Sequence, residues 1–552
     1  MNQKIHSSAR VETSFRRVKT LVPTLIAGVL LFCTARTYGI NASPHPVDLA
    51  QPDGTRITLR PKGDEVAHWF EDMNGFTVVR DGARYMYAQR RVDGGLGPTA
   101  FMVGRDNPRA LNLQEKLRPS PQFLIGERQK SQPQGITGGP VARILPVGTV
   151  KNLVILVRFS DHALGVHTRE PADYNVIFNT AGGSPALAPT GSLKDYYRET
   201  SYGTMTLEST VIAWITLPQT EEYYAAGVDG RGFYPRNGQG MVKDALDIAD
   251  SLVNFAQFDV DNDGFVDAID IIHSGYAAET GEGGGNWIWS HKWSLFAVPG
   301  GRWTSGDQNG NGVSVKVFDY HTEPALWGVS GTDITRIGVI AHETGHFFGL
   351  PDLYDTDGGS EGIGSYCLMA NSWGFDGSQL YPPHLSAWAK IELGWVTPIT
   401  IAPGTYNAPR VETTRTIFRI TNGYPNGEYL LIENRQPVGF EAAMPQGGLA
   451  IWHIDNNQVD NNDEGYPAGL GWPSNHYQVA LLQADGAYHL ERGLNRGDAG
   501  DVYRGGGVSS LTGITVPNTD GYQSGFFTAT ANQILNIGSS ASNMTFTFAN
   551  PN

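Results

Sequence analysis

Apolar runs and helical periodicity alternate along the chain and predict a protein that mixes strands and helices. Residues 153–157 form an unbroken apolar run, as in a strand buried on both faces. Residues 240–255 have apolar side chains at helical spacing, 332–348 show the clearest helical pattern, and 386–393 give another candidate helix. Strand-like runs follow after residue 397, at 416–420, 429–432, 449–452 and 544–548. The pattern predicts an α+β fold.

The N-terminus has the pattern of an export signal. Within residues 1–42, Arg16, Arg17 and Lys19 precede a largely apolar run at 21–35. A membrane-spanning helix needs about 20 apolar residues, so this shorter run favours a cleaved signal peptide over an anchor. We therefore expect a secreted, extracellular protein with no stable membrane insertion after signal cleavage.

A small β-rich unit and a linker come next. Residues 43–126 carry short strand-like runs separated by turns. Residues 127–146 are poor in large apolar side chains and rich in Gln, Gly and Pro, and they include Arg128, Lys130 and Arg143. This composition is typical of a linker with exposed basic residues, where a protease could cut.

Composition narrows the classes of protein. Of the 552 residues, 40% are apolar and 17% charged, which excludes a disordered or fibrous chain. The formal charge is −15. Without residues 1–42 the chain holds 34 Lys and Arg against 54 Asp and Glu, which argues against nucleic acid as a partner. Cys33 and Cys367 are the two cysteines, so no internal disulfide framework is possible once the leader is removed.

The most specific chemistry lies in a short motif near the middle of the chain. His342 and His346 are four residues apart, so on a helix both imidazoles lie on one face and can share a zinc ion. Glu343 lies between them and can reach a zinc-bound water as general base. A surface helix with two solvated histidines is the alternative.

The third zinc ligand is expected just after this helix. Gly349 can end the helix, and Pro351 cannot continue it. The chain can then turn back and deliver Asp352, ten residues after His342. Asp355 is the rival ligand. Three protein ligands and one open position are what a catalytic zinc requires.

A second acidic motif, at 259–270, has the spacing of a calcium loop. Its aspartates fall at positions 1, 3, 5, 9 and 12, with Gly264 at position 6. The predicted calcium ligands are Asp259, Asp261, Asp263, the carbonyl of Phe265, Asp267 and Asp270. Strand-like residues follow, so this is not an EF-hand pair, and we expect a structural calcium ion. A solvated acidic turn is the alternative.

The zinc motif resembles that of the metzincin proteases, and this implies that Met369 is the methionine of their methionine turn, beneath the zinc. Asn371 stands where some metzincins carry a metal-contacting tyrosine, so no tyrosine is assigned that role. By the same analogy, the strand-like residues 313–318 could be the edge strand that pairs with an extended peptide. His384 and His453 lie beside apolar residues and are interpreted as structural.

A closer resemblance is to the immune inhibitor A family of secreted bacterial metalloproteases, and it covers most of the mature chain. The matching segments are 153–161, 192–197, 201–203, 342–355, 373–374, 384–395, 429–436, 452–455 and 483–486. The resemblance implies a signal peptide at 1–42, a propeptide with linker at 43–144, a zinc protease domain at 145–398 and a β-rich region at 399–552.

The expected fold is therefore α+β, with a metzincin-like protease domain that has a mixed sheet and an active-site helix. The expected function is a zinc endopeptidase, monomeric and made as a zymogen, that hydrolyses extracellular proteins or peptides. Zinc is the catalytic cofactor and calcium the structural one. Two alternatives remain: a catalytically idle protein that binds surfaces or matrix, and a zinc exopeptidase.

Overall fold

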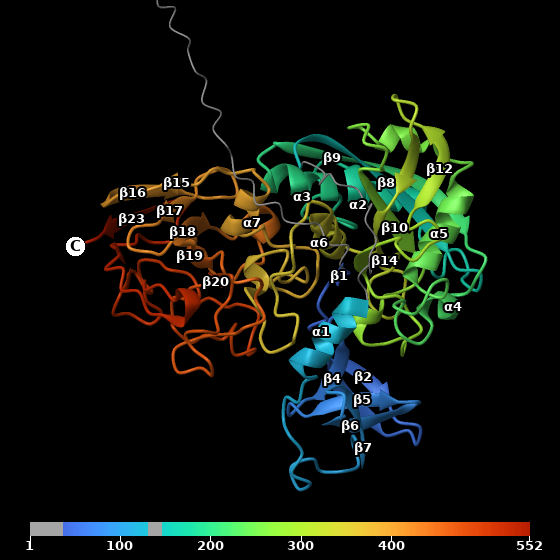
Figure 1. Cartoon of the computed structure of the whole chain (residues 1–552), viewed down its shortest axis with the longest axis horizontal. Helices are drawn as coiled ribbons and strands as arrows, with labels where there is room; N and C mark the ends of the chain where they lie inside the picture. The colour runs from blue at the N-terminus through green and yellow to red at the C-terminus, as the bar shows by residue number, and fades with distance from the viewer. Residues whose placement is uncertain (1–36, 131–145, 552) are drawn as a thin grey trace, which may run out of the picture.

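The computed structural model describes residues 37–130 and 146–551 (Figure 1). Most of the predicted signal peptide, and Arg143 of the predicted linker, lie outside these residues. No helix within the described ranges is long and apolar enough to cross a membrane. The structure contains both helices and several sheets, which confirms the prediction that helices and strands are mixed in an α+β fold.

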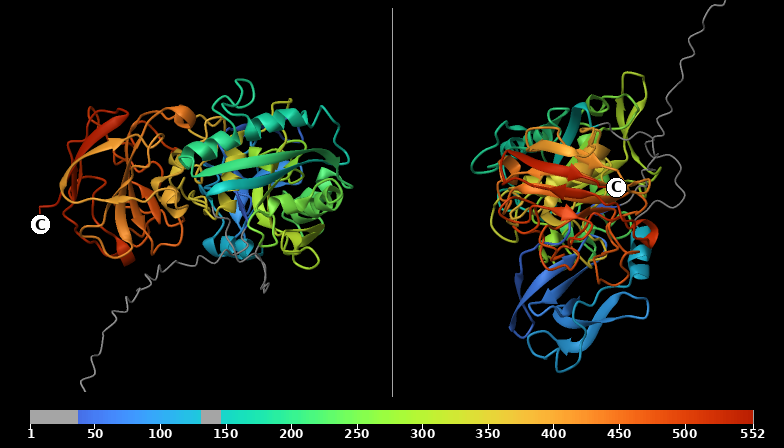
Figure 2. Two further views of the ribbon diagram at one scale, coloured as in Figure 1. Left: turned by 90° about the horizontal axis from the view of Figure 1, so that it is seen from above. Right: turned by 90° about the vertical axis from the view of Figure 1, so that its left-hand side faces the viewer.

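The N-terminal unit, residues 44–130, is an antiparallel sheet with one helix, α1 (Pro121–Lys130). Its strands follow one another in sequence order: β2 (Val47–Ala50), β3 (Arg56–Gly63), β4 (His68–Asp72), β5 (Thr77–Asp81), β6 (Arg84–Arg90) and β7 (Leu96–Met102). Leu59, Phe76 and Val78 are central to its small core. Figure 2 shows this unit on one side of the other two.

The central unit, residues 146–398, is built on a mixed sheet with the order β1-β11-β14-β10-β8-β9. β8 runs parallel to β9 and β10, and β10 runs parallel to β14, whereas β11 is antiparallel to β14. The strands are β1 (Tyr38–Gly39), β8 (Gly148–Arg158), β9 (Met205–Thr216), β10 (Ala268–His273), β11 (His291–Ser294) and β14 (Asp319–Pro324). The apolar run at 153–157 is wholly buried in β8, as its sequence predicts.

Helices cover this sheet. They are α2 (Pro171–Asn179), α3 (Leu193–Thr200), α4 (Glu221–Ala225), α5 (Gly238–Ala249), α6 (Ile337–Phe347) and α7 (Ala387–Glu392). α6 packs against β14, where the Phe347 ring lies edge-on to the His321 ring at 5.1 Å between centroids. From α3, the Tyr197 hydroxyl donates to the Ala341 carbonyl of α6 at 2.6 Å.

The strand predicted at 313–318 forms, but it lies outside the sheet that packs against α6. These residues form β13 (Ser314–Val317), which pairs antiparallel with β12 (Trp303–Gln308) in a separate hairpin. The turn at 309–312 lets the chain fold back, with Gly312 at φ +73° and the Asn309 amide donating to the Val313 carbonyl. Beside the active-site helix, β11 is the strand that pairs with β1.

The C-terminal unit, residues 399–551, contains two sheets with the orders β15-β17-β18-β19-β20 and β16-β23-β22-β21. The strands are β15 (Ile399–Thr400), β16 (Gly404–Pro409), β17 (Phe418–Ile420), β18 (Glu428–Arg435), β19 (Gly448–Asp455), β20 (Val479–Leu481), β21 (Leu511–Thr512), β22 (Gln533–Leu535) and β23 (Asn543–Ala549). Both sheets contribute to one apolar core, in which the Phe418 and Phe546 rings are 5.3 Å apart.

The two histidines interpreted as structural are buried and bind carboxylates. His384 Nε2 lies 2.8 Å from Glu199 Oε1, and His453 Nε2 lies 2.8 Å from Glu428 Oε1. The first pair joins α3 to the residues before α7, and the second joins β18 to β19 within the C-terminal unit.

Candidate active site

α6 carries the two histidines and the glutamate of the sequence motif, and every residue of this helix is buried. The helix ends at Phe347, and Gly349 follows with φ +82°, a conformation that glycine adopts without strain. The chain therefore reverses immediately after the second histidine. This reversal returns Asp352 to the face of the helix that carries His342 and His346.

The three predicted zinc ligands converge. The Nε2 atoms of His342 and His346 are 3.1 Å apart, and Asp352 Oδ1 lies 3.2 Å from the first and 3.4 Å from the second. Ligands at about 2.0–2.1 Å from a tetrahedral zinc are separated by roughly 3.3 Å. The donor set and its spacing therefore fit a zinc ion. Asp355 lies elsewhere, with its carboxylate accepting from Ser360 and from the Asp357 amide.

Backbone carbonyls fix the orientation of both imidazoles. His342 Nδ1 lies 3.0 Å from the Leu368 carbonyl, and His346 Nδ1 lies 2.8 Å from the Leu350 carbonyl. Each carbonyl can accept a proton from Nδ1, which leaves the Nε2 lone pair free to bind a metal. Burial also lowers the pKa of His346, which favours the neutral ligand form.

Met369 packs beneath α6 at Gly345, and this glycine lies between the two histidines in the sequence. A Cβ built on Gly345 would lie 2.6 Å from Met369 Sδ, so close that the thioether or the helix would have to shift. Glycine at this position therefore admits the thioether directly under the site. A glycine inside an otherwise helical motif is the signal in the sequence that could have pointed to this contact.

Glu343 is buried, and neither carboxylate oxygen has a hydrogen-bond partner among the described residues. Burial raises the pKa of Glu343 well above its usual range, and the carboxylates of Glu323 and Asp352 raise it further. For Asp352, burial acts in the same direction, but the two imidazoles outweigh it and hold the pKa below its usual range. The carboxyls of Glu343 and Asp352 thus differ in proton affinity. This difference is expected where one carboxyl accepts a proton and the other binds a metal.

Residues 37–43, which we call the cleft segment, lie across this site. Through β1 they pair antiparallel with β11, Tyr38 opposite Lys292 and Gly39 opposite His291. The Tyr38 ring stacks on the His346 ring, with centroids 4.5 Å apart and planes 19° apart. Figure 1 shows β1 beside α6, away from the other strands near the N-terminus.

Side chains of the central unit hold the backbone carbonyls of the cleft segment. The Tyr354 hydroxyl donates to the Gly39 carbonyl at 2.7 Å, and the indole nitrogens of Trp289 and Trp373 donate to those of Ile40 and Asn41 at 3.0 Å each. Because every residue has a backbone carbonyl, hydrogen bonds of this kind can hold segments of many different sequences. The role of this segment was not predicted, because residues 37–42 fall within the expected signal peptide.

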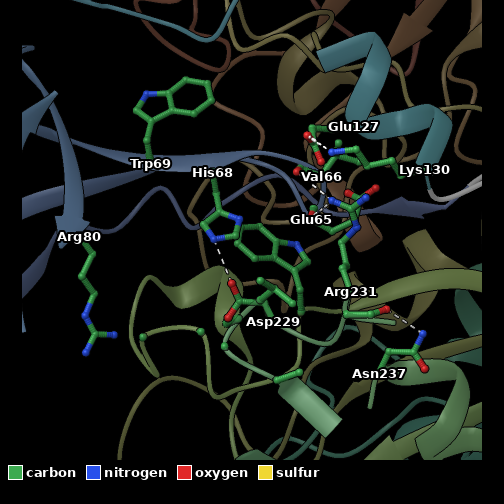
Figure 3. A pocket seen from close by; sticks show the side chains of 18 of the residues that line it. Glu65, Val66, His68, Trp69, Arg80, Glu127, Lys130, Asp229, Arg231 and Asn237 are labelled. Atoms are coloured by element: carbon green, nitrogen blue, oxygen red, sulfur yellow. Dashed lines mark hydrogen bonds and ion pairs between the residues drawn. The ribbon is translucent and has the colours of Figure 1, made fainter. Parts of the chain in front are cut away.

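The N-terminal unit also contacts the central unit directly, around a cavity of about 1260 Å³ (Figure 3). His68 Nε2 lies 2.9 Å from Asp229 Oδ2, and Arg231 donates to the carbonyls of Glu65 and Val66. Arg128 is not the exposed residue that the linker composition predicted. Its guanidinium binds the Asp64 carboxylate at 2.6 Å and the Thr356 carbonyl at 2.8 Å.

Part of the predicted calcium loop comes together. Asp259, Asp261 and Asp263 each place a carboxylate oxygen within 4.8 Å of the others. Asp267 lies close by, with Oδ2 3.4 Å from the Val260 amide, and burial together with Asp261 raises its pKa to about 7.

Of the other two predicted ligands, the Phe265 carbonyl stays a prediction, and Asp270 belongs to another cluster. The Phe265 ring packs under the Lys316 ammonium at 5.4 Å, and the Phe265 amide donates to Asp263. Asp270 is not part of the loop cluster. It lies within β10, and its carboxylate is grouped with His321 and Glu323.

Comparison with known proteins gives matches over the central unit. Residues 147–396 match the catalytic domain of the immune inhibitor A peptidases, family M6. Immune inhibitor A of Bacillus thuringiensis subsp. alesti is 34% identical over 258 residues, which cover 40% of this chain and 36% of that protein. The pre-pro-metalloprotease PrtV of Vibrio cholerae serotype O1 is 27% identical over 360 residues, which cover 57% of this chain and 37% of the relative.

The chain thus spans little more than a third of the length of either curated relative. The matched region nevertheless contains the whole of α6, Asp352 and Met369. Residues 147–396 of this chain therefore correspond to the catalytic domain of the immune inhibitor A peptidases.

Proposed function

We propose that this protein is a secreted zinc endopeptidase, made as a latent precursor, that cleaves extracellular proteins or peptides. The observation that carries the proposal is the convergence of His342 Nε2, His346 Nε2 and Asp352 Oδ1 at mutual distances of 3.1–3.4 Å. The buried carboxylate of Glu343 lies next to this ligand set in the sequence of α6. The name of the Vibrio relative, a pre-pro-metalloprotease, supports the same interpretation.

When bound, a zinc ion supplies a Lewis acid that polarises the scissile carbonyl and lowers the pKa of a water molecule. Glu343 takes the proton from the attacking water and passes it to the leaving amine nitrogen. Its desolvated carboxylate, whose pKa is raised, is suited to hold that proton between the two steps. Met369 supports the helix from below, and the carbonyls of Leu350 and Leu368 hold the imidazoles in place.

We place the substrate backbone along β11. The cleft segment already pairs with this strand as an extended chain, so a peptide can add to the same edge by main-chain hydrogen bonds. The cleft segment and a substrate therefore compete for one position, which is the basis of the proposed latency. The predicted propeptide would include the cleft segment and the N-terminal unit.

This arrangement revises the proposed end of the signal peptide. Cleavage after residue 42 would remove most of the cleft segment, including the buried Ile40. We propose cleavage after Ala35, where Cys33 and Ala35 give small residues at the third and first positions before the cut. Mass spectrometry of the exported precursor should find Arg36 as the first residue. A first residue at Ser43 would contradict the proposal.

We also propose that Asp259, Asp261 and Asp263 hold a structural calcium ion. Their carboxylates lie within 4.8 Å of one another, and calcium takes oxygen ligands of this kind. Asp267 adds a fourth nearby carboxylate. Asp270 is left out of this proposal because its side chain belongs to another cluster.

The test of the main proposal measures zinc content and casein cleavage on the same preparations. Wild type, Glu343→Gln and a control, Glu170→Gln, are exported as the full chain, and a second protease cuts all three within residues 131–145, so that maturation does not depend on their own activity. Glu170 is exposed and makes no capping bond at the start of α2, so its variant should match wild type. Loss of the general base should lower cleavage by at least about 10²–10⁴-fold while zinc content stays unchanged.

Chelation separates the remaining possibilities. A chelator should abolish cleavage by wild type, and added zinc should restore it. Zinc-loaded, processed wild type that cleaves neither casein nor gelatin would instead favour a catalytically idle binding protein. Folded wild type that binds no zinc would refute the proposal.

A further inference from the structure

Three side chains form a second buried cluster behind the active-site helix. Asp270 comes from β10, and His321 and Glu323 come from β14. Asp270 and His321 are partners in the parallel pairing of these strands, and residues two apart on a strand share a face. All three are fully buried, and each offers a ligand atom within 4.8 Å of the others.

Several polar atoms of this cluster have no hydrogen-bond partner among the described residues. His321 Nδ1 lies 2.7 Å from Glu323 Oε1 and 3.7 Å from Asp270 Oδ1. Within the described residues, both Asp270 oxygens, Glu323 Oε2 and His321 Nε2 have no hydrogen-bond partner. These atoms lie where no solvent reaches them, so each carries a desolvation penalty that a bound ion would offset.

The cation that acts on His321, the Lys292 ammonium, already has a partner. Lys292 is opposite His321 in the pairing of β11 with β14, but its ammonium lies 2.7 Å from Asp319 Oδ1. The cluster therefore holds two carboxyls and one imidazole without a compensating side chain among those described. Burying ionised carboxylates in this way is unfavourable unless a proton or a cation compensates their charge.

We propose that Asp270, His321 and Glu323 bind a second divalent metal ion, zinc or manganese, distinct from the ion held by His342, His346 and Asp352. One imidazole nitrogen with two carboxylates is a donor set that suits these metals. Calcium prefers six to eight oxygen ligands, which this dry cluster does not supply. The site would join β10 to β14 directly under α6, which His321 contacts through Phe347.

The competing explanation is a proton instead of a metal ion. Burial raises the pKa of both Asp270 and Glu323 well above the usual range, and a single proton could be shared between these two carboxyls. A shared proton would leave the metal content of the protein unchanged when either residue is altered. Metal counting therefore separates the two explanations.

The experiment counts zinc, manganese and calcium per chain by inductively coupled plasma mass spectrometry. The full chain carries Glu343→Gln, to prevent self-cleavage, and is purified after exposure to zinc or manganese chloride. Two transition-metal ions per chain are expected. Asp270→Asn should leave one, His346→Ala should leave one, and the two together should leave none. Asp261→Asn is the matched control and should change only calcium.

This design keeps the new site independent of the proposed function. If His346→Ala loses no metal while Asp270→Asn loses one equivalent, the assigned catalytic site fails and the second site stands. If Asp270→Asn and Glu323→Gln both fold and both retain the full count, the second site is refuted.

The His346→Ala protein keeps the test decisive should the other variants misfold. Its cluster is unaltered, so after stripping with a chelator it should rebind one equivalent of zinc or manganese and melt at a higher temperature. Folded His346→Ala protein that rebinds no transition metal, or binds calcium alone, would overturn the inference.

Discussion

Gly345 is the position in α6 where one added carbon atom should matter most. Its Cβ would lie 2.6 Å from Met369 Sδ and 3.3 Å from Met369 Cε, with the Tyr197 hydroxyl 3.6 Å away. In an open helix, Gly→Ala stabilises by about 1 kcal/mol. Overpacking of a filled core costs about 1–3 kcal/mol. We therefore expect Gly345→Ala to destabilise α6 by about 0–2 kcal/mol, despite the gain in helix propensity.

A double-mutant cycle isolates the contact with the sulfur atom. Met369→Ala should itself cost about 2–5 kcal/mol, because it leaves a cavity under the site. In that background the new methyl group meets no thioether, so Gly345→Ala should stabilise by about 1 kcal/mol. The coupling free energy between the two positions is then about 1–3 kcal/mol, which equals the cost of overpacking.

Hydrogen–deuterium exchange measures the stability of α6 itself. A local measurement is needed because a chain of several units does not unfold in one two-state transition. The full chain carries Glu343→Gln, and amide protection is followed over α6 and α1 separately. Gly126→Ala is the control, since it lies in α1 and its Cβ would meet no atom within 4 Å. It should protect α1 by about 1 kcal/mol. If Gly345→Ala also increases protection, and is additive with Met369→Ala within about 0.5 kcal/mol, the methionine does not support the helix at this glycine.

Three further predictions concern the cleft segment, the N-terminal unit and the calcium loop. Tyr38→Ala removes an aromatic contact with His346 worth about 0.5–1.5 kcal/mol, so self-processing of the purified precursor should accelerate about 2- to 12-fold. An unchanged rate would show that the stacking does not contribute to latency. Burial raises the pKa of Glu65 to about 8, above an unfolded value of about 4.3. The stabilisation that this carboxyl gives to the folded precursor is therefore complete below pH 4 and is lost as the pH rises toward 8. Precursor processing should therefore quicken between pH 5 and 8, and Glu65→Gln should flatten that rise; an equal rise in both proteins would contradict the assignment. Calcium should raise the melting temperature of wild type, and Asp261→Asn should abolish the shift, whereas an equal shift in both would exclude this loop as the calcium site.

Local spacing was enough to predict the core of the site. Two histidines four apart need only a helix to share one face, and the helix forms at 337–347. The glycine that ends it also accounts for the return of Asp352, so these three ligands could be assigned without knowledge of the sheet. The buried strand at 153–157 was predictable for a similar reason, because an apolar run of that length is itself the signal.

Contacts between distant segments were not predictable in this way. Asp270 fits position 12 of a calcium loop by spacing, yet it lies in β10, and strand pairing directs its side chain to His321, 51 residues further along the chain. The cleft segment reaches His346 across more than 300 residues. In both cases the partner of a residue is set by sheet register, which a single sequence does not encode in an evident way.

Buried negative charge connects the active site, the second buried cluster and the N-terminal unit. Glu343 lies near Glu323, Asp352, Glu65 and Glu279, and each of these carboxylates raises its pKa after burial has done so. A metal ion bound by Asp352 and one bound by Glu323 would each compensate a carboxylate that belongs to the central unit and stays with it. Glu65 differs because it belongs to the N-terminal unit, and neither of its carboxylate oxygens has a hydrogen-bond partner among the described residues. Removal of the cleft segment together with that unit would therefore both vacate β11 and withdraw one carboxylate from the surroundings of Glu343. In the proposed precursor, latency would therefore depend on charge as well as on occupation of the cleft.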